Sequence, residues 1–363
     1  MSAFLRYGSQ PLSTKVKTFQ TLVGVGASII KSRIARRRQP IFLSLFVTNH
    51  CNLRCRYCFI IDETVPKERL RAQYSKQEIF DLVDEFYSMG TRMVFLLGGE
   101  PLVHPEIGEV VDYIVDKGIY LHLITNGTLL HNKIKEIGRA HCICVSLDGV
   151  GEINDCLRGT GTFERALVGI RAAVANGVPT RIHCVLTRRN LLEIRPLAEL
   201  ARDLGVALTF SPPNYLGETA NPDMRISKDE YKQAWSGIWQ LRKEGFPIGN
   251  SSLAIEKCKD WPIDYHQYIR RGERHLGYKP VFCRNGHTYV ALGAEGVMYN
   301  CINLGCLNGP NIGEMGVRQA WERLLEWRPD CVSCASINCI ETGIMLAGRL
   351  EAISYGGRFH MDR

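Results

Sequence analysis

Short apolar runs alternate with amphipathic segments along most of this chain. Six runs have the composition of buried strands: Pro40–Thr48, Arg92–Leu97, Tyr120–Thr125, Cys142–Leu147, Thr180–Leu186 and Ala207–Ser211. Segments with helical periodicity lie between and after them: Lys76–Ser88, Ile107–Lys117, Asn132–Ile137, Phe163–Asn176 and Leu192–Leu204. Strands that alternate with helices predict a parallel sheet with crossover helices, either open or closed into a partial barrel. In such sheets the chemistry gathers at the carboxyl ends of the strands.

The charge of the chain is concentrated at its beginning. The net charge is +8, and residues 1–39 carry eight basic residues and no acidic one. The remaining residues contain 37 bases against 37 acids, so the body of the protein is formally neutral. A neutral body is not a general polyanion binder, and we expect no nucleic-acid partner.

The basic leader also has an apolar side. Phe19, Leu22, Val23, Ile29, Ile30 and Ile34 lie roughly on one side of a helix. The apolar run is interrupted by glycines and is shorter than the ~20 residues of a spanning helix. Residues 15–38 therefore predict either packing on the protein's own domain or contact with an anionic membrane surface. An organelle transit peptide is a further interpretation of this basic segment. We expect a cytoplasmic protein, and contact with the inner face of the membrane is a hypothesis to test.

The chain contains 14 cysteines, which is its one compositional excess. No secretory signal opens the sequence, so metal binding in a reducing compartment is favoured over disulfides. Directly after the first predicted strand come Cys51, Cys55 and Cys58, with three and two residues between them. Three thiolates from one loop can hold three irons of a four-iron cluster and leave the fourth iron open. A zinc site completed by a distant histidine is the alternative.

This loop resembles that of the radical S-adenosylmethionine (radical SAM) superfamily, in which an aromatic residue, here Tyr57, precedes the third cysteine. The second predicted strand ends in Gly98, Gly99, Glu100 and Pro101, which is similar to the glycine-rich stretch that meets the methionine amino group. Later strand ends also match the family pattern. The resemblance implies that the following residues contact the cofactor: Asn126, Ser146, Asp148 and Arg158. A solvated surface arginine is the alternative for Arg158.

The resemblance implies radical chemistry in an α/β fold, a partial (βα)6 TIM-type barrel with a small C-terminal α+β cluster-binding extension. Its cofactors are then a 4Fe–4S cluster on Cys51, Cys55 and Cys58 and S-adenosylmethionine, which is cleaved to a 5′-deoxyadenosyl radical. A one-electron donor such as flavodoxin or ferredoxin is expected. The protein orients the cofactor against a substrate and excludes water.

A second group of cysteines lies in the C-terminal third. Val290–Leu292 and Val297–Tyr299 predict a β-hairpin around Gly296 that brings Cys283 and Cys301 together. With Cys331 and Cys334, this arrangement resembles the SPASM/twitch extension. The resemblance implies one auxiliary iron–sulfur cluster, a 4Fe–4S cluster, on Cys283, Cys301, Cys331 and Cys334. A four-cysteine zinc site is the alternative, and Cys306 and Cys339 are spare ligands.

The expected organisation is a leader over 1–39, a barrel over 40–250 and an auxiliary-cluster region over 251–363. The function that we predict is hydrogen abstraction from a small-molecule or lipid-like substrate, in a dehydrogenation, rearrangement or carbon–carbon bond formation. A peptide-modifying maturase is the alternative. Similar maturases often carry an N-terminal peptide-binding domain, and only 39 residues precede the first strand here, which disfavours this alternative. A non-catalytic redox sensor is the remoter alternative.

Overall fold

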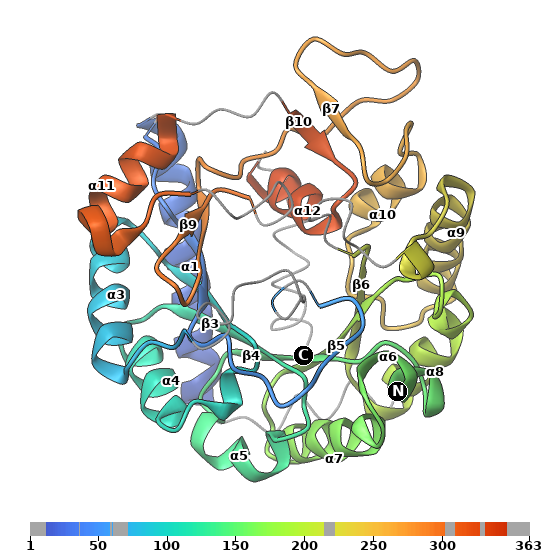
Figure 1. Ribbon diagram of the computed structural model, residues 1–363, viewed down its shortest axis with the longest axis horizontal. Coiled ribbons are helices and arrows are strands. Elements are labelled where there is room, and N and C mark those ends of the chain that lie inside the picture. Colours follow the sequence, from blue (N-terminus) through green and yellow to red (C-terminus); the bar gives the residue numbers. More distant parts are fainter. Residues whose placement is uncertain are drawn as a thin grey trace.

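The computed structural model describes residues 12–35, 37–58, 60, 72–213, 222–301, 309–326 and 331–346. Within these residues, a curved sheet of eight strands forms the centre of the fold (Figure 1). The strand order is β6-β5-β4-β3-β2-β1-β8-β9. The first six strands in the chain pair in parallel: β1 (Phe42–Phe46), β2 (Met93–Leu97), β3 (Tyr120–Thr125), β4 (Cys142–Ser146), β5 (Thr180–Val185) and β6 (Ala207–Ser211). The predicted partial barrel is confirmed.

Helices surround the outside of this sheet (Figure 1). They are α3 (Lys76–Met89), α4 (Ile107–Asp116), α5 (Leu130–Ile137), α6 (Glu152–Arg158), α7 (Thr162–Ala175), α8 (Ile194–Leu204), α9 (Lys228–Lys243) and α10 (Ser252–Lys259). The predicted start of α3 is confirmed, because Ser75 and Glu78 form a complete capping box. The sequence patterns did not reveal the short helix α6, which carries Arg158 at its end.

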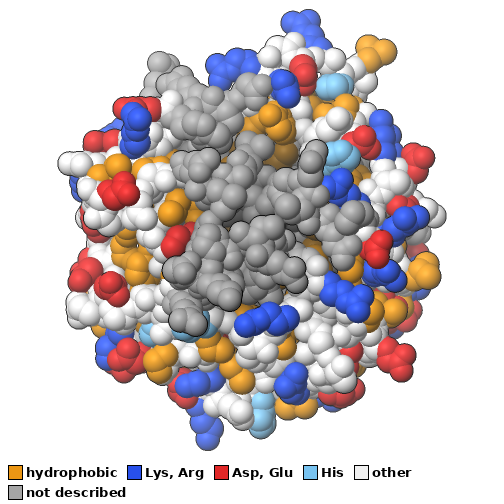
Figure 2. Space-filling view, viewed as in Figure 1, with side chains coloured by type: hydrophobic (Ala, Val, Ile, Leu, Met, Phe, Trp, Pro, Cys, Tyr) orange, Lys and Arg blue, Asp and Glu red, His pale blue; other side chains and the backbone are white. Residues whose placement is uncertain are grey.

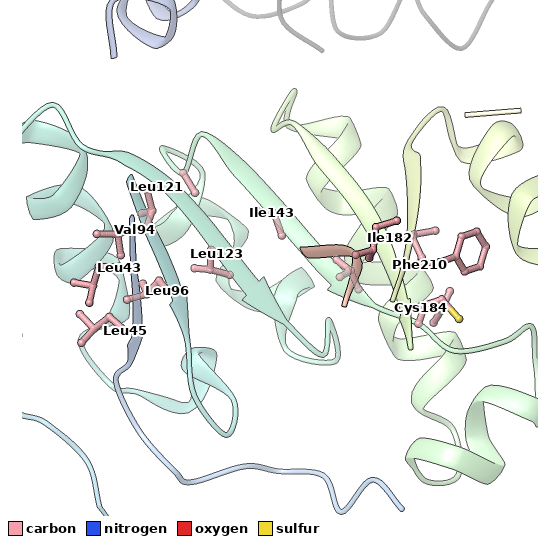
Figure 3. Packing of buried hydrophobic residues seen from close by; sticks show 14 of the residues in the cluster. Leu43, Leu45, Val94, Leu96, Leu121, Leu123, Ile143, Ile182, Cys184 and Phe210 are labelled. Atoms are coloured by element: carbon pink, nitrogen blue, oxygen red, sulfur yellow. The ribbon is translucent and has the colours of Figure 1, made fainter. Parts of the chain in front are cut away.

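The two faces of the sheet differ in chemistry. Leu43, Val94, Leu121, Ile182 and their alternate neighbours point toward the helices and form the hydrophobic core (Figure 3). Because side chains alternate along a strand, the residues between them lie on the opposite face. We call this the inner face; its members include Ser44, Phe95, His122, Cys142, Cys144, Ser146, Arg181, His183, Thr209 and Ser211.

The predicted C-terminal hairpin is confirmed as β8 (Tyr289–Leu292) and β9 (Met298–Tyr299). Strand β8 also pairs in parallel with β1, so this hairpin continues the barrel sheet. The other elements of this region are a ribbon of β7 (Tyr268–Arg270) and β10 (Cys331–Cys334), and the helices α11 (Ile312–Glu326) and α12 (Ile337–Leu346). The predicted division of the chain at residue 250 stays a prediction.

The leader helix α1 (Leu12–Ile34) packs on the protein itself. Val25 and Ile29 are buried in a small cluster with Ile41, Phe42 and Tyr120. These partners lie at the beginnings of the strands, so α1 lies at the end of the barrel opposite the strand ends that carry the cysteine loop. In the described part of the chain, no helix is long and apolar enough to cross a bilayer.

Candidate functional site

The candidate cofactor residues gather at one edge of the sheet. The cysteine loop follows β1, Gly98–Pro101 follow β2, Asn126 follows β3, and Ser146 ends β4. Because these strands are parallel, their carboxyl ends share an edge, as the sequence predicted. Hydrogen bonds join the end of β2 to the end of β3, and the end of β3 to the cysteine loop.

A buried ionic network connects the cysteine loop to the end of β4. Arg158 Nε donates to the carboxylate of Asp148 at 2.6 Å, and the side chains are only 8% and 0% exposed. Arg158 also donates to the hydroxyl of Tyr57 at 2.5 Å and lies 3.9 Å from the sulfur of Cys55. Tyr57 in turn donates to Asp148. Arg158 is therefore a buried member of the site, and the alternative of a solvated surface arginine is wrong.

The thiols of the cysteine loop lie close enough to influence one another. Burial raises the pKa of Cys55 to about 12, Arg158 opposes this rise, and Cys58 and Cys51 add to it. Burial also raises the pKa of Cys51. Since metal binding needs thiolates, loading this loop with iron must release protons.

Gly98 and Gly99 allow two backbone segments to approach closely. The N–H of Gly99 donates to the carbonyl of Thr48 at 2.6 Å, and the N–H of Glu100 donates to that of His50 at 2.8 Å. A Cβ at Gly98 would overlap the carbonyl of Thr48, and one at Gly99 would overlap that of His50. The glycines thus hold the chain that leads into the cysteine loop, which is a packing role the sequence did not indicate.

Glu100 ties the end of β2 to the end of β3. Its carboxylate accepts from the N–H of Leu102 at 3.0 Å, the hydroxyl of Thr125 at 2.7 Å and the N–H of Asn126 at 2.6 Å. Burial raises its pKa to about 7, against the opposing effect of these donors and of Arg158. Its predicted contact with the ammonium group of S-adenosylmethionine stays a prediction.

Asn126, at the end of β3, contacts the cysteine loop through a hydrogen bond. Its amide donates to the side chain of Asn52 at 2.8 Å, and Asn52 donates to Thr128 at 2.9 Å. Asn52 was not singled out from the sequence, although it lies between Cys51 and Cys55. Ser146 faces the barrel interior and is the register partner of His183 on β5.

The C-terminal cysteines form a second cluster, and Cys339 lies within it. Hydrogen bonds link Cys339 with Cys283 and with Cys334, and its thiol is influenced electrostatically by Cys301. Asn285 donates to the sulfur of Cys339 at 3.5 Å. The backbone N–H of Cys283 donates to Val332, the neighbour of Cys331, at 2.8 Å. The structure thus brings Cys283, Cys301 and Cys334 close together and adds Cys339. Cys331 lies next to Val332 at the same place, whereas Cys306 lies outside the described residues.

The hairpin between β8 and β9 links the two groups of cysteines. Glu295 at its tip accepts from the amide of Asn49 at 3.1 Å, close to the cysteine loop. Tyr74 donates to the carbonyl of Gly293 at 2.8 Å. The hairpin is therefore held against the chain that leads from β1 into the cysteine loop, and β8 itself pairs with β1.

No group of three or more His, Cys, Asp or Glu side chains in the described ranges is arranged to hold a single metal ion. Thiolates that hold a 4Fe–4S cluster each bind a different iron. The cysteine loop offers three such donors in mutual electrostatic contact, beside the cationic Arg158, and this donor set fits an anionic cluster.

Comparisons with known proteins identify the family of this chain. Residues 45–201 match the family described as the Radical SAM superfamily. An AdoMet-dependent heme synthase of Methanosarcina barkeri is 30% identical over 304 residues, which cover 80% of this chain and 84% of that protein. The mycofactocin maturase MftC of Mycobacterium tuberculosis is 32% identical over 338 residues, covering 85% of this chain and 79% of that protein.

Solved structures with low sequence identity share the fold. Streptococcus suis SuiB bound to its precursor peptide SuiA superposes with a TM-score of 0.63 at 15% identity, covering 83% of this chain and 69% of that chain. The protein anSMEcpe with bound AdoMet gives a TM-score of 0.58 at 16% identity, covering 88% of this chain and 100% of that chain.

Proposed function

This chain belongs to the radical SAM superfamily, and from that premise we propose that it removes a hydrogen atom from a small organic substrate held inside the barrel. It is an enzyme of α/β barrel fold, and its family uses a 4Fe–4S cluster and S-adenosylmethionine. The observation that carries the proposal is the buried network of Arg158, Asp148, Tyr57 and Cys55, because it joins the cysteine loop to the strand end where the cofactor is expected.

Cys51, Cys55 and Cys58 are the proposed ligands of the 4Fe–4S cluster. When bound, this cluster supplies the electron that cleaves S-adenosylmethionine to a 5′-deoxyadenosyl radical. The protein's contribution is to position and to shield. Arg158 places a fixed positive charge beside the sulfur of Cys55, where it favours the thiolate that iron requires.

The segments after β2, β3 and β4 are the proposed binding surface for S-adenosylmethionine. Ser146 offers a hydroxyl to the cofactor, and Asn126 holds the cysteine loop at the correct edge of the sheet. Glu100 fixes the positions of Thr125 and Asn126, and Gly98 and Gly99 hold the chain that enters the loop.

Two substrate classes remain in view. The similarity to a heme synthase over 80% of this chain supports a small-molecule substrate. The similarity to MftC, and a shorter match to the subtilosin biosynthesis protein AlbA, supports a peptide substrate as the second candidate. Anaerobic incubation with reductant should yield 5′-deoxyadenosine, and a protein that forms none would refute both. Metabolite and peptide comparison of cells with and without the gene then separates them.

We propose that the auxiliary cluster is held by Cys283, Cys301, Cys334 and Cys339, with Cys339 taking the place first predicted for Cys331. The mutual hydrogen bonds of Cys339 with Cys283 and Cys334 support this choice. The Cys339→Ser variant should lose roughly half of the iron of a protein with two four-iron clusters, whereas Cys331→Ser should retain it. Iron analysis and Mössbauer spectra of both variants test this, and the opposite result would restore Cys331 as the ligand.

We also propose that α1 contacts anionic lipid. Phe19, Val23, Ile30 and Ile34 are 51%, 53%, 60% and 80% exposed, and they form one stripe along the helix at spacings of four and seven. The stripe lies away from the buried face of Val25 and Ile29 described above. Exposed basic residues adjoin its end: Lys31, Arg33 and Arg37. An apolar stripe beside cationic side chains matches the chemistry of an anionic membrane surface.

Sedimentation with vesicles tests this contact. The Phe19→Ser/Ile34→Ser variant should bind vesicles of anionic lipid about 10-fold more weakly than the unmodified protein, since it loses two exposed apolar groups. Leu192→Ser is the matched control, because Leu192 is 91% exposed but lies far from the basic segment in the sequence. Equal sedimentation of all three proteins would refute the proposal.

A further inference from the structure

The inner face of the barrel carries an arginine, Arg181, that no acidic side chain contacts among the residues that the structure describes. We propose that Arg181, together with His122, binds an oxyanion group of the substrate, a carboxylate or a phosphate, within the barrel. This inference rests on the proposed function and deepens it, because it specifies the substrate's chemistry.

Strand register locates Arg181 relative to the cofactor site. Arg181 pairs with Cys144 on β4, and the next inward residue of β5, His183, pairs with Ser146. Two residues along a strand span about 6–7 Å, so Arg181 lies that far below the level of Ser146 along the sheet. A substrate that binds Arg181 through one end therefore presents its other end toward the strand ends and the cysteine loop.

The charge of Arg181 is not neutralised by a contacting carboxylate. Among the described residues, no ion pair includes Arg181, and its Nε atom is buried without a hydrogen-bond partner. Its guanidinium has a side-chain hydrogen bond with the thiol of Cys144, which is not a carboxylate, and Cys142 is a further electrostatic neighbour. Burial raises the pKa of Cys142 to about 12, so this thiol stays neutral. A partly buried cation without a contacting counter-ion is unfavourable, and a bound anion offsets that cost.

Glu341 on α12 is an acidic group that Arg181 influences, but other groups hold it. Its carboxylate accepts from the backbone N–H of Ser251 at 2.6 Å and from the Ser251 hydroxyl at 2.7 Å. Arg242 also has a greater effect on the pKa of Glu341 than Arg181 has. Glu341 thus leaves the guanidinium of Arg181 available to a ligand.

Two neutral imidazoles complete the surroundings. Burial, and then Arg181, hold the pKa of His122 well below its ordinary value, and burial lowers that of His183 to about 3. His183 is engaged by the hydroxyls of Thr209 and Ser211 at 2.9 and 3.0 Å. His122 is 5% exposed, and its Nε2 has no hydrogen-bond partner in the described part of the chain, so in the Nε2–H tautomer this nitrogen can donate to an oxyanion beside Arg181.

Solvent reaches this part of the inner face. Arg181 and His183 are partly exposed, although their outward-facing neighbours Ile182 and Cys184 are fully buried. The planar guanidinium of an arginine pairs with carboxylate or phosphate through two parallel hydrogen bonds. An accessible arginine with an orphaned Nε and a neighbouring orphaned imidazole nitrogen is thus equipped for a ligand of this class.

Titration calorimetry with acetate and with phosphate, at constant ionic strength and without reductant, tests the inference on the reconstituted protein. At least one of the two anions should bind about 10-fold or more weakly to Arg181→Gln than to the unmodified protein. Arg195→Gln is the matched control, because it removes a surface arginine paired with Glu244. The anion that binds more tightly identifies the preferred oxyanion.

Equal affinities in Arg181→Gln and the unmodified protein, or binding of neither anion, would overturn the inference. A clear loss of stability of Arg181→Gln in anion-free buffer would also overturn it, since it would mean that the protein itself neutralises this charge. Should Arg181→Gln fail to fold, Arg181→Lys must bind the anion several-fold more weakly, and equal binding refutes the idea. A protein that forms 5′-deoxyadenosine but binds neither anion refutes this inference alone.

Discussion

The Cys55→Ala variant should form no 5′-deoxyadenosine above background when it is incubated anaerobically with S-adenosylmethionine and reductant. Removing one of three thiolates leaves the proposed cluster with two protein ligands in the loop. The loss should exceed the roughly 10–100-fold effect of removing an outer-shell partner at a metal site. Chromatographic quantification of 5′-deoxyadenosine, beside the absorption and paramagnetic-resonance spectra of the cluster, measures it.

Cys156→Ala is the matched control for this experiment. Cys156 is exposed on α6, the helix that carries Arg158. It should retain both the spectrum and the product. Continued turnover by Cys55→Ala would contradict the assignment of the loop, and the whole proposed function would then lack its cofactor.

The Asp148→Asn variant should lower the free energy of unfolding by about 3–5 kcal/mol, because it leaves the buried Arg158 without its carboxylate. The same change replaces the oxygen that accepts from Tyr57 and Arg158 with an NH2 group that donates, whereas the remaining oxygen can still accept from the backbone N–H of Val185. We also expect less iron in the reconstituted protein, because Arg158 would no longer be fixed beside Cys55. Urea unfolding monitored by circular dichroism and iron analysis provide the two measurements.

Asp116→Asn serves as the comparison for the loss of a surface ion pair. Asp116 is 65% exposed and pairs with Arg139 on the outside of the barrel. Its loss should cost less than about 1 kcal/mol, as is usual for exposed pairs. If Asp148→Asn cost no more than Asp116→Asn, the network would not hold the cysteine loop in place.

Local patterns were sufficient to predict the barrel and the sheet edge at which the candidate site residues gather. Each strand from β1 to β6 is a short apolar run followed by a turn, and parallel pairing then brings the strand ends together without further information. The cysteine spacing identified the loop in the same way. Figure 2 agrees with the balanced charge predicted for the body, because acidic and basic side chains are interspersed on the face that it shows.

Contacts between distant segments could not be predicted in this way. The pairing of β8 with β1 and the approach of Cys339 to Cys283 depend on how the C-terminal region folds back, and no local periodicity records it. Arg181 is different, because it lies between Thr180 and Ile182 in a predicted strand and so faces the opposite side of the sheet from them. A charged residue at an inward position was therefore visible in the sequence, but its lack of a contacting acidic partner could be seen only in three dimensions.

The partnership of β1 with β8 has a consequence for synthesis on the ribosome. Phe42 can pair with Tyr289 only after about 250 further residues have been synthesised. At roughly 5–20 residues per second, this takes some ten to fifty seconds. During that interval the N–H and C=O groups along the free edge of β1 are unpaired and can form hydrogen bonds with strands of other chains. Premature termination before β8 should therefore give aggregates, even though every strand of the barrel proper has already emerged.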